Sequence, residues 1–201
     1  MKTRFGLIGV GGALLVGLLL AGWQFLGRGY TFKGSLIDPA VPAADFTLKD
    51  QHGEVFQLGS QKGKVVLIFF GYTNCPDVCP ITLTDFKRIK NELGDLAEEV
   101  RFVFITVDPE RDTVERLNAY LPSYDPSIYG LTGEKEQLEQ VWKSYGVYQA
   151  RQESGSAAGY LVDHTARIYA IDKQGNWRLT YPFEMERSAV IDDIRQLLKE
   201  D

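Results

Sequence analysis

The sequence predicts an α/β fold in which helices flank a central mixed sheet. Two apolar runs, Val65–Phe70 and Val100–Val107, are apolar on both faces, as is typical of buried parallel strands. Between them, Ile81–Leu93 carries apolar residues at every third or fourth position and is followed by Gly94, which indicates an amphipathic helix. These segments form a βαβ unit, so the centre of the sheet is expected to be parallel.

The elements on either side of this unit can be placed in chain order. Before it, Phe46–Leu58 has the alternating apolar positions and the central turn of a β-hairpin. After it come a helix capped within Asp108–Thr113 and reaching Leu121, a short strand at Ile128–Leu131, a helix at Glu134–Tyr145, strands at Val147–Ala150 and Thr165–Ile171 around a mobile loop at Arg151–Gly159, a strand at Trp177–Tyr181, and a last helix at Arg187–Lys199. This order is that of a thioredoxin-like fold with insertions, and no repeat or second domain is indicated.

The N-terminus has a different character. No charged residue occurs from Phe5 to Gly27, whereas Lys2 and Arg4 precede this span and Arg28 follows it. Such a span is long enough to cross a bilayer as a helix, and the basic residues before it predict that the domain lies outside the cytoplasm. A cleaved signal peptide is the alternative, which is disfavoured by the length of the apolar run and the lack of a clear Ala-x-Ala site.

The chain is therefore expected to consist of three segments. Residues 1–28 form a short cytoplasmic start and a transmembrane anchor, residues 29–45 a linker, and residues 46–201 the thioredoxin-like domain. The basic start is too short for an organellar transit peptide, which favours the bacterial inner membrane with the domain in the periplasm. The net charge of −5 argues against a nucleic-acid-binding protein, which requires a basic face.

Both cysteines of the chain, Cys75 and Cys79, lie between the first buried strand and the helix that follows it. The amides and dipole of a helix N-terminus favour negative charge and lower the pKa of a nearby thiol. Pro80 suits the first helical position, so Cys75–Cys79 is expected to be a loop. Two thiolates in a loop can close a redox-active disulfide or bind a soft metal ion with a third ligand. The alternative is a structural disulfide or two buried thiols, and it is disfavoured because so small a disulfide ring removes little entropy from the unfolded chain.

The two histidines of the chain differ in context. His52 falls in the turn of the first predicted hairpin, where an exposed position is expected. His164 comes where the predicted mobile loop returns to the sheet, and it is the candidate third ligand beside Cys75 and Cys79. Two sulfurs and an imidazole suit copper, because thiolates select Cu(I) and imidazole also binds Cu(II); zinc remains an alternative on ligand type.

Two carboxylates are candidates to support these ligands without binding the metal. Asp77 lies between the cysteines, and Asp108 follows the second buried strand, whose end should approach the same rim of the sheet. Ordinary carboxylates at helix starts are the alternative for both residues.

Three stretches resemble the signature motifs of the Sco (SenC) family. They are Gly71–Pro80, Thr106–Thr113 and Val162–Thr165, in the order in which the family has them and behind a single predicted anchor. The resemblance spans about residues 45 to 195.

The resemblance implies a thioredoxin-like domain that binds one copper through Cys75, Cys79 and His164. It also implies a role in assembling the dinuclear copper centre in subunit II of cytochrome c oxidase. The expected partners are that subunit or a related copper-accepting protein, other periplasmic copper chaperones, and thioredoxin-like reductants.

Two functions of different class fit these residues. One is a metallochaperone that holds copper until a partner takes it, and the other is a thiol-disulfide oxidoreductase in which Cys75 and Cys79 cycle and reduce the recipient cysteines. His164 separates them, because disulfide exchange requires no distant imidazole. A peroxiredoxin-like peroxidase is disfavoured because its nucleophile motif is missing from the sequence.

Overall fold

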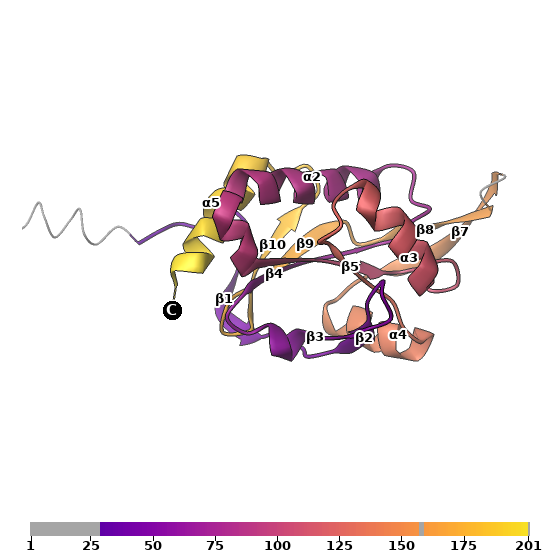
Figure 1. Ribbon diagram of the computed structural model, residues 1–201, viewed down its shortest axis with the longest axis horizontal. Helices are drawn as coiled ribbons and strands as arrows, with labels where there is room; N and C mark the ends of the chain where they lie inside the picture. Colours follow the sequence, from indigo (N-terminus) through magenta and orange to yellow (C-terminus); the bar gives the residue numbers. More distant parts are fainter. Residues whose placement is uncertain (1–28, 157–158, 201) are drawn as a thin grey trace, which may run out of the picture. The chain divides into compact units, whose positions relative to one another are not determined.

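A six-stranded mixed sheet forms the centre of the computed structural model, which describes residues 29–156 and 159–200 (Figure 1). The strands run in the order β1-β10-β9-β4-β5-β6, with β4, β5 and β6 parallel and the other neighbours antiparallel. Their bounds are β1 Ser35–Pro42, β4 Val65–Gly71, β5 Val100–Thr106, β6 Tyr129–Leu131, β9 Arg167–Ile171 and β10 Asn176–Pro182. The predicted βαβ unit is confirmed and supplies the centre of the sheet.

Helices cover both faces of this sheet, as Figure 1 shows. On one face, α2 (Val78–Leu93) packs beside α5 (Arg187–Lys199). On the other, α4 (Lys135–Ser144) lies with a small sheet of β2 (Thr47–Lys49) and β3 (Val55–Gln57). The remaining helical elements are α3 Val114–Tyr120 and the short turns η1 Leu58–Gln61, η2 Gly94–Glu99 and η3 Leu121–Ser123. The predicted α/β fold with a mixed central sheet is thus confirmed.

β4 lies in the middle of the sheet, and all seven of its residues are buried. Its sequence is apolar on both faces, which suits this position. Leu83, Phe86 and Ile89 of α2 are buried in the same core, and they are the apolar positions that predicted this helix. Removing such continuous apolar surface from water is the main stabilising contribution to the fold, about 25 cal/mol per Å². The carboxyl end of β4 therefore leads into a well-fixed strand-to-helix turn.

The start of α2 differs from the prediction. The helix begins at Val78, so Cys79 lies in its first turn and Pro80 is its third residue. Pro80 is tolerated there because the first N–H groups of a helix have no partner within the helix. The prediction that the whole of Cys75–Cys79 is a loop is therefore wrong at its C-terminal end.

The predicted linker of residues 29–45 is wrong for its central part. Ser35–Pro42 form β1, an edge strand that pairs antiparallel with β10. Nearly all of its side chains are exposed, so it lacks the apolar alternation by which a strand is recognised. The chain divides into two units, residues 1–31 and 32–201, and all of the elements described here belong to the second.

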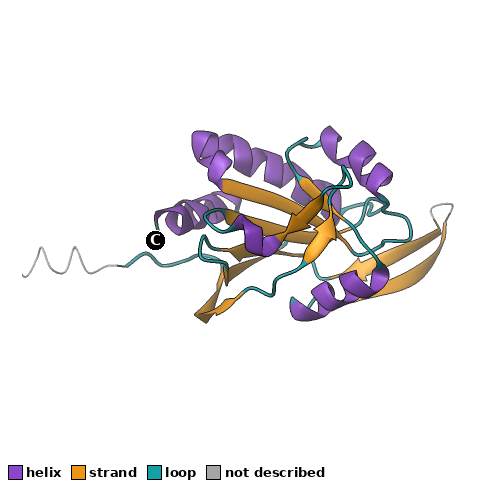
Figure 2. Ribbon diagram, turned by 60° about the horizontal axis from the view of Figure 1, so that its bottom comes forward, coloured by secondary structure: helices purple, strands orange, loops and turns teal. Residues whose placement is uncertain are grey.

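The prediction of a mobile loop at Arg151–Gly159 is also corrected. β7 (Gln149–Ser156) and β8 (Gly159–His164) form an antiparallel hairpin that is a separate two-stranded sheet. Figure 2 shows it extending away from the rest of the domain. Residues 151–153 are all exposed, so neither face of this strand shows a buried, apolar pattern in the sequence. β8 brings its last residue, His164, back to the body of the fold.

The predicted anchor of residues 1–28 lies outside the described residues. Among the residues that the structure does describe, no helix has the length and apolar character needed to cross a membrane.

Candidate metal centre

Three elements bring the predicted ligands together at one end of the sheet. Cys75 lies in the turn after β4, Cys79 in the first turn of α2, and His164 at the end of β8. Their sulfur atoms and an imidazole nitrogen all lie within 4.8 Å of one another. Cys79 Sγ is 3.6 Å from His164 Nε2, and the backbone N–H of Cys79 donates to Cys75 Sγ at 3.5 Å. Residues 85 positions apart thus form one cluster.

Cys79 is buried, and a glycine makes room for its sulfur. A Cβ atom added at Gly71 would lie 2.9 Å from Cys79 Sγ and 2.8 Å from the rings of Phe69 and Phe104. Contacts that short do not occur in relaxed structures, so a larger residue would displace the sulfur or the rings. Gly71 was not singled out from the sequence, because the need for a glycine at this position arises from the close packing of α2 on β4.

The two thiols have opposite acidities. The pKa of Cys75 is lowered to about 4, mainly because the Cys79 thiol donates a hydrogen bond to its sulfur; His164 and the backbone N–H groups of Asp77 and Cys79 add to this effect. Burial raises the pKa of Cys79 far above its usual range, and the Cys75 thiolate acts in the same direction. In the metal-free, reduced protein, Cys75 is therefore the thiolate and Cys79 holds the shared proton.

The imidazole of His164 is oriented by its surroundings. Its ring meets the rings of Phe69 and Tyr72 edge to face, with centroids 6.0 and 5.8 Å away. Nδ1 lies 3.3 Å from the carbonyl oxygen of Thr165, which accepts a hydrogen bond when Nδ1 carries the proton. In that tautomer the Nε2 lone pair faces the sulfur of Cys79, as metal binding requires, whereas the tautomer that donates to the Cys75 sulfur favours the thiolate.

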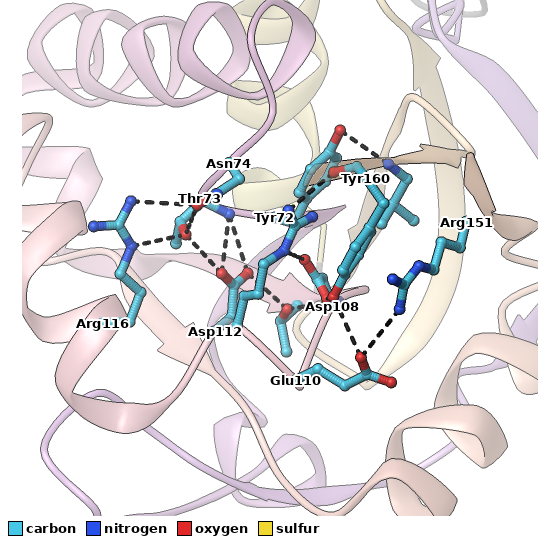
Figure 3. Close-up of polar contacts among 12 residues, drawn as sticks. Tyr72, Thr73, Asn74, Asp108, Glu110, Asp112, Arg116, Arg151 and Tyr160 are labelled. Atoms are coloured by element: carbon cyan, nitrogen blue, oxygen red, sulfur yellow. Dashed lines mark hydrogen bonds and ion pairs between the residues drawn. The ribbon is translucent and has the colours of Figure 1, made fainter. Parts of the chain in front are cut away.

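A buried carboxylate that sequence reasoning missed fixes the cysteine turn. Asp112 is fully buried and accepts hydrogen bonds from the backbone N–H of Thr73 and from the hydroxyls of Thr73 and Thr106 (Figure 3). Burial raises its pKa, while these hydrogen bonds oppose the rise. It thereby ties the residues just before Cys75 to the end of β5. Asp112 lies in the Thr106–Thr113 motif after a buried strand, but neither the motif nor this position separated it from an ordinary helix-start carboxylate.

The two carboxylates proposed from the sequence take different places. The side chain of Asp77 is exposed, and it is the backbone N–H of this residue that acts on Cys75. Asp108 is buried, and its carboxylate accepts from Arg111 and from the Tyr160 hydroxyl of β8. Asp108 therefore contacts the β7–β8 hairpin, which carries His164. His52 is exposed in the turn between β2 and β3, as predicted.

The donor set decides which metal chemistry fits. Two sulfurs and one neutral imidazole are soft to intermediate ligands, which suit copper in both of its common oxidation states. Binding requires loss of the Cys79 proton, so uptake of a metal ion releases a proton and becomes stronger as the pH rises.

The fold and these side chains define a thioredoxin-like domain with a group of two cysteines and one histidine that could hold a metal ion at a strand-to-helix turn. A family model described as SCO1/SenC matches residues 36–199, and the chain belongs to this family. The family comprises copper-binding proteins that act in the assembly of cytochrome c oxidase. The resemblance noted in the sequence is thus confirmed.

Individual relatives agree with this assignment. The mitochondrial SCO2 homolog of Bos taurus is 35% identical over an alignment of 202 positions, which covers 98% of this chain and 75% of the relative. Bradyrhizobium japonicum ScoI, solved with copper bound, is 38% identical with a TM-score of 0.72 and covers 79% of this chain and 100% of its own. Yeast Sco1, also solved with copper bound, is 32% identical with a TM-score of 0.72 and covers 81% and 91%. Copper is therefore the metal expected at this Cys-Cys-His group.

Proposed function

We propose that this protein is a membrane-anchored copper metallochaperone that assists assembly of the dinuclear copper centre in subunit II of cytochrome c oxidase. Cys75, Cys79 and His164 hold the copper until the recipient takes it. The observation that carries the proposal is the convergence of three donor atoms within 4.8 Å, one of them from a separate hairpin. Disulfide exchange alone would need the two thiols and no imidazole.

The test is His164→Ala in the reduced, full-length chain. The variant should lose most of its affinity for Cu(II) together with the thiolate-to-copper absorption band. Cu(I) should be affected less, because two thiolates can hold it linearly. The dithiol-disulfide couple should persist. His52→Ala is the matched control and should change none of these properties, since this side chain is exposed in a distant turn. Binding of both copper states like the parent would contradict the three-ligand site.

A second function is favoured by the acidity of the thiols. A pKa of about 4 for Cys75 beside a protonated Cys79 is the arrangement of a nucleophilic and a resolving thiol. As a thiol-disulfide oxidoreductase, the pair would reduce the recipient's disulfide, passing on two electrons and the one proton held by Cys79 while closing its own disulfide, and the second recipient thiolate would take its proton from water. The Cys75–Cys79 disulfide and bound copper exclude each other, because both use the same sulfur electron pairs. Copper uptake by the reduced protein only would fit either function, so His164→Ala decides between them.

We place the protein in the bacterial inner membrane, held by the uncharged span Phe5–Gly27, with the domain in the periplasm. The partners that fit this location are subunit II of cytochrome c oxidase or a related copper acceptor, other periplasmic copper chaperones, and thioredoxin-like proteins that reduce Cys75 and Cys79. Cys75 and His164 are only half-buried, which supports transfer of copper from the cluster to a partner.

A further inference from the structure

The turn of residues 108–112 lies between the cysteine turn and the β7–β8 hairpin that carries His164. It follows β5, and one of its ends holds the cysteine turn through the bonds from Asp112 to Thr73. Asp108, at the other end, bonds to Tyr160 of the hairpin (Figure 3), and Arg111 donates to the carbonyl oxygen of Tyr160. The same short segment thus contacts the supports of both the sulfur ligands and the nitrogen ligand.

The buried contacts from this turn to the hairpin converge on Tyr160 of β8, and the remaining one is an exposed ion pair between Glu110 and Arg151. Its hydroxyl donates to Asp108 Oδ1 at 2.7 Å, and its carbonyl oxygen accepts from Arg111 Nη1 at 2.9 Å. The Arg111 guanidinium also stacks on the Tyr160 ring, 3.6 Å from its centroid, and pairs with the Asp108 carboxylate. Asp108 is only 4% exposed, so these charge-assisted bonds are shielded from water and strong.

The hairpin depends on such contacts for its position. β7 and β8 pair with each other and are not part of the six-stranded sheet. An isolated two-stranded hairpin is at best marginally stable in water, so its attachments to the domain determine where its end lies. A second attachment is the hydroxyl of Tyr72, which accepts from the backbone N–H of Val162 at 3.1 Å. Both attachments precede His164 by a few residues on the same strand.

We propose that Asp108, Arg111 and Tyr160 are positioning residues that set the distance of the His164 imidazole from the two sulfurs. They act through β8 and bind no metal themselves. If they are removed, His164 occupies its binding position for a smaller fraction of the time, and the apparent affinity of any metal that needs the imidazole falls by that fraction. The copper part of this inference rests on the proposed function, whereas the position of the imidazole can be tested without metal.

A matched control lies on the same ring. The Arg151 guanidinium is also 3.6 Å from the Tyr160 ring centroid, but its side chain is 52% exposed and its ion-pair partners, Glu110 and Glu153, are exposed as well. Arg151→Gln therefore removes an equal stacking contact without cutting the link between the hairpin and Asp108. Tyr160→Phe removes the hydroxyl alone and keeps the ring.

The first measurement is the proton NMR spectrum of the reduced, metal-free, full-length chain. The chain has two histidines, and His52→Gln identifies the signal of His164. Because the His164 ring lies against the Phe69 and Tyr72 rings, its signals carry ring-current shifts. In Arg111→Gln and Tyr160→Ala these signals should move toward those of a free imidazole. Tyr160→Phe should move them less, and Arg151→Gln should leave them in place.

The second measurement compares Cu(II) affinity with the dithiol-disulfide potential in the same variants. Arg111→Gln and Tyr160→Ala should lower Cu(II) affinity on the order of tenfold, as loss of groups that orient a metal ligand generally does. The potential should stay that of the parent, because Asp112 still holds the cysteine turn. Affinity and potential should both be unchanged in Arg151→Gln.

Three results would overturn the inference. One is an unshifted His164 signal in Arg111→Gln and Tyr160→Ala. Another is a parallel change in the potential and in Cu(II) affinity, which would indicate general damage to the site. The third is an equal effect of Arg151→Gln. If Tyr160→Ala does not fold, Tyr160→Phe and Arg111→Gln decide by the same criteria. If the parent fails to bind copper, the proposed function fails while the NMR comparison still decides the positioning role.

Discussion

Cys75 and Cys79 lie only four positions apart in the sequence, yet the surroundings of their thiols give them different roles. Cys75 is half-buried and its sulfur accepts hydrogen bonds, whereas Cys79 is buried against β4 and donates one. Only a thiolate attacks a disulfide or an alkylating reagent. Cys75 is therefore the residue that should react first with a partner protein.

We expect iodoacetamide to alkylate Cys75 in the reduced, metal-free chain at a rate that changes little between about pH 6 and about pH 9. This window lies above its pKa of about 4, so the thiolate is already the dominant form. An unperturbed thiol, with a pKa of about 8.5, gains roughly tenfold per pH unit below that value. Peptide mass spectrometry over time measures the rates. A Cys75 rate that climbs steeply through pH 7 and 8 would contradict the low pKa.

Gly71→Ala tests whether the position of the Cys79 sulfur matters. The added methyl group would overlap Cys79 Sγ and two aromatic rings, so we expect the free energy of unfolding to fall by about 1–3 kcal/mol. Displacement of the sulfur should also weaken copper binding and shift the thiolate-to-copper absorption. Chemical denaturation and a copper titration measure the two effects.

Gly130→Ala is the control for this substitution. Its Cβ would lie 2.1 Å from Leu121 Cδ1, in β6 rather than beside the cysteines. It should destabilise the fold while the copper absorption of the folded protein stays that of the parent. If both variants change the absorption alike, Gly71 has no special relation to Cys79.

Single residues also show where sequence reasoning ends. The cysteines and His164 could be singled out because soft ligands are rare in the chain and the strand-to-helix turn around the cysteines is plain in the apolar pattern. Asp112 and Tyr160 could not, because their roles arise from hydrogen bonds to residues 39 and 52 positions away. Such contacts depend on how strands and hairpins come together, which no local pattern records.

At the scale of elements, the buried and the exposed parts of the fold were predictable to different degrees. β4, β5, α4 and α5 have apolar faces, and all were located from the sequence to within a few residues. β1, β8 and β7 beyond Ala150 were not recognised as strands, since the side chains of β1 and of residues 151–153 face solvent and show no apolar alternation. The order of hydrogen-bonded neighbours in the sheet was likewise beyond the local pattern, because it depends on pairing between distant segments.

The chain just before β1 is held to the domain by a buried carboxylate. Asp193 of α5 is fully buried and accepts from the backbone N–H groups of Lys33 and Gly34 at 2.8 to 3.0 Å. Asp193→Ala would leave these donors without this acceptor, so we expect a loss of about 2 kcal/mol in the free energy of unfolding. Hydrogen exchange should also become faster at the amides of β1. Chemical denaturation and exchange mass spectrometry measure the two effects.

The neighbouring Asp192 provides the control. Its carboxylate is exposed and pairs with the Lys33 side chain, an ion pair of a kind that contributes little. Asp192→Ala should therefore unfold close to the parent. A similar loss in both variants would show that charge near Lys33, rather than the buried hydrogen bonds, holds the start of β1.

For the whole molecule, β1 shortens the distance over which the domain can be tethered. The linker predicted from the sequence ran over residues 29–45, but β1 begins at Ser35, so only residues 28–34 separate the sheet from the uncharged span that ends at Gly27. An extended segment of this length reaches at most about 25 Å, at ~3.5 Å per residue. If the span is an anchor, this segment limits how far the start of β1 can lie from the end of the span.

The proposed topology gives the last prediction. The uncharged span Phe5–Gly27, with Lys2 and Arg4 before it, should keep the protein in the membrane fraction and place its C-terminus outside the cytoplasm, because basic residues next to a span are retained on the cytoplasmic side. Alkaline phosphatase fused after Asp201 should therefore be active, and a fluorescent reporter that requires the cytoplasm should be dark. Leu15→Arg supplies the control, since a charge at the centre of a span costs about 2.5–3.5 kcal/mol and should reduce the membrane-bound fraction. A soluble mature product that begins near Trp23 would show instead that the span is a cleaved signal peptide, and the domain would then reach its acceptors by diffusion.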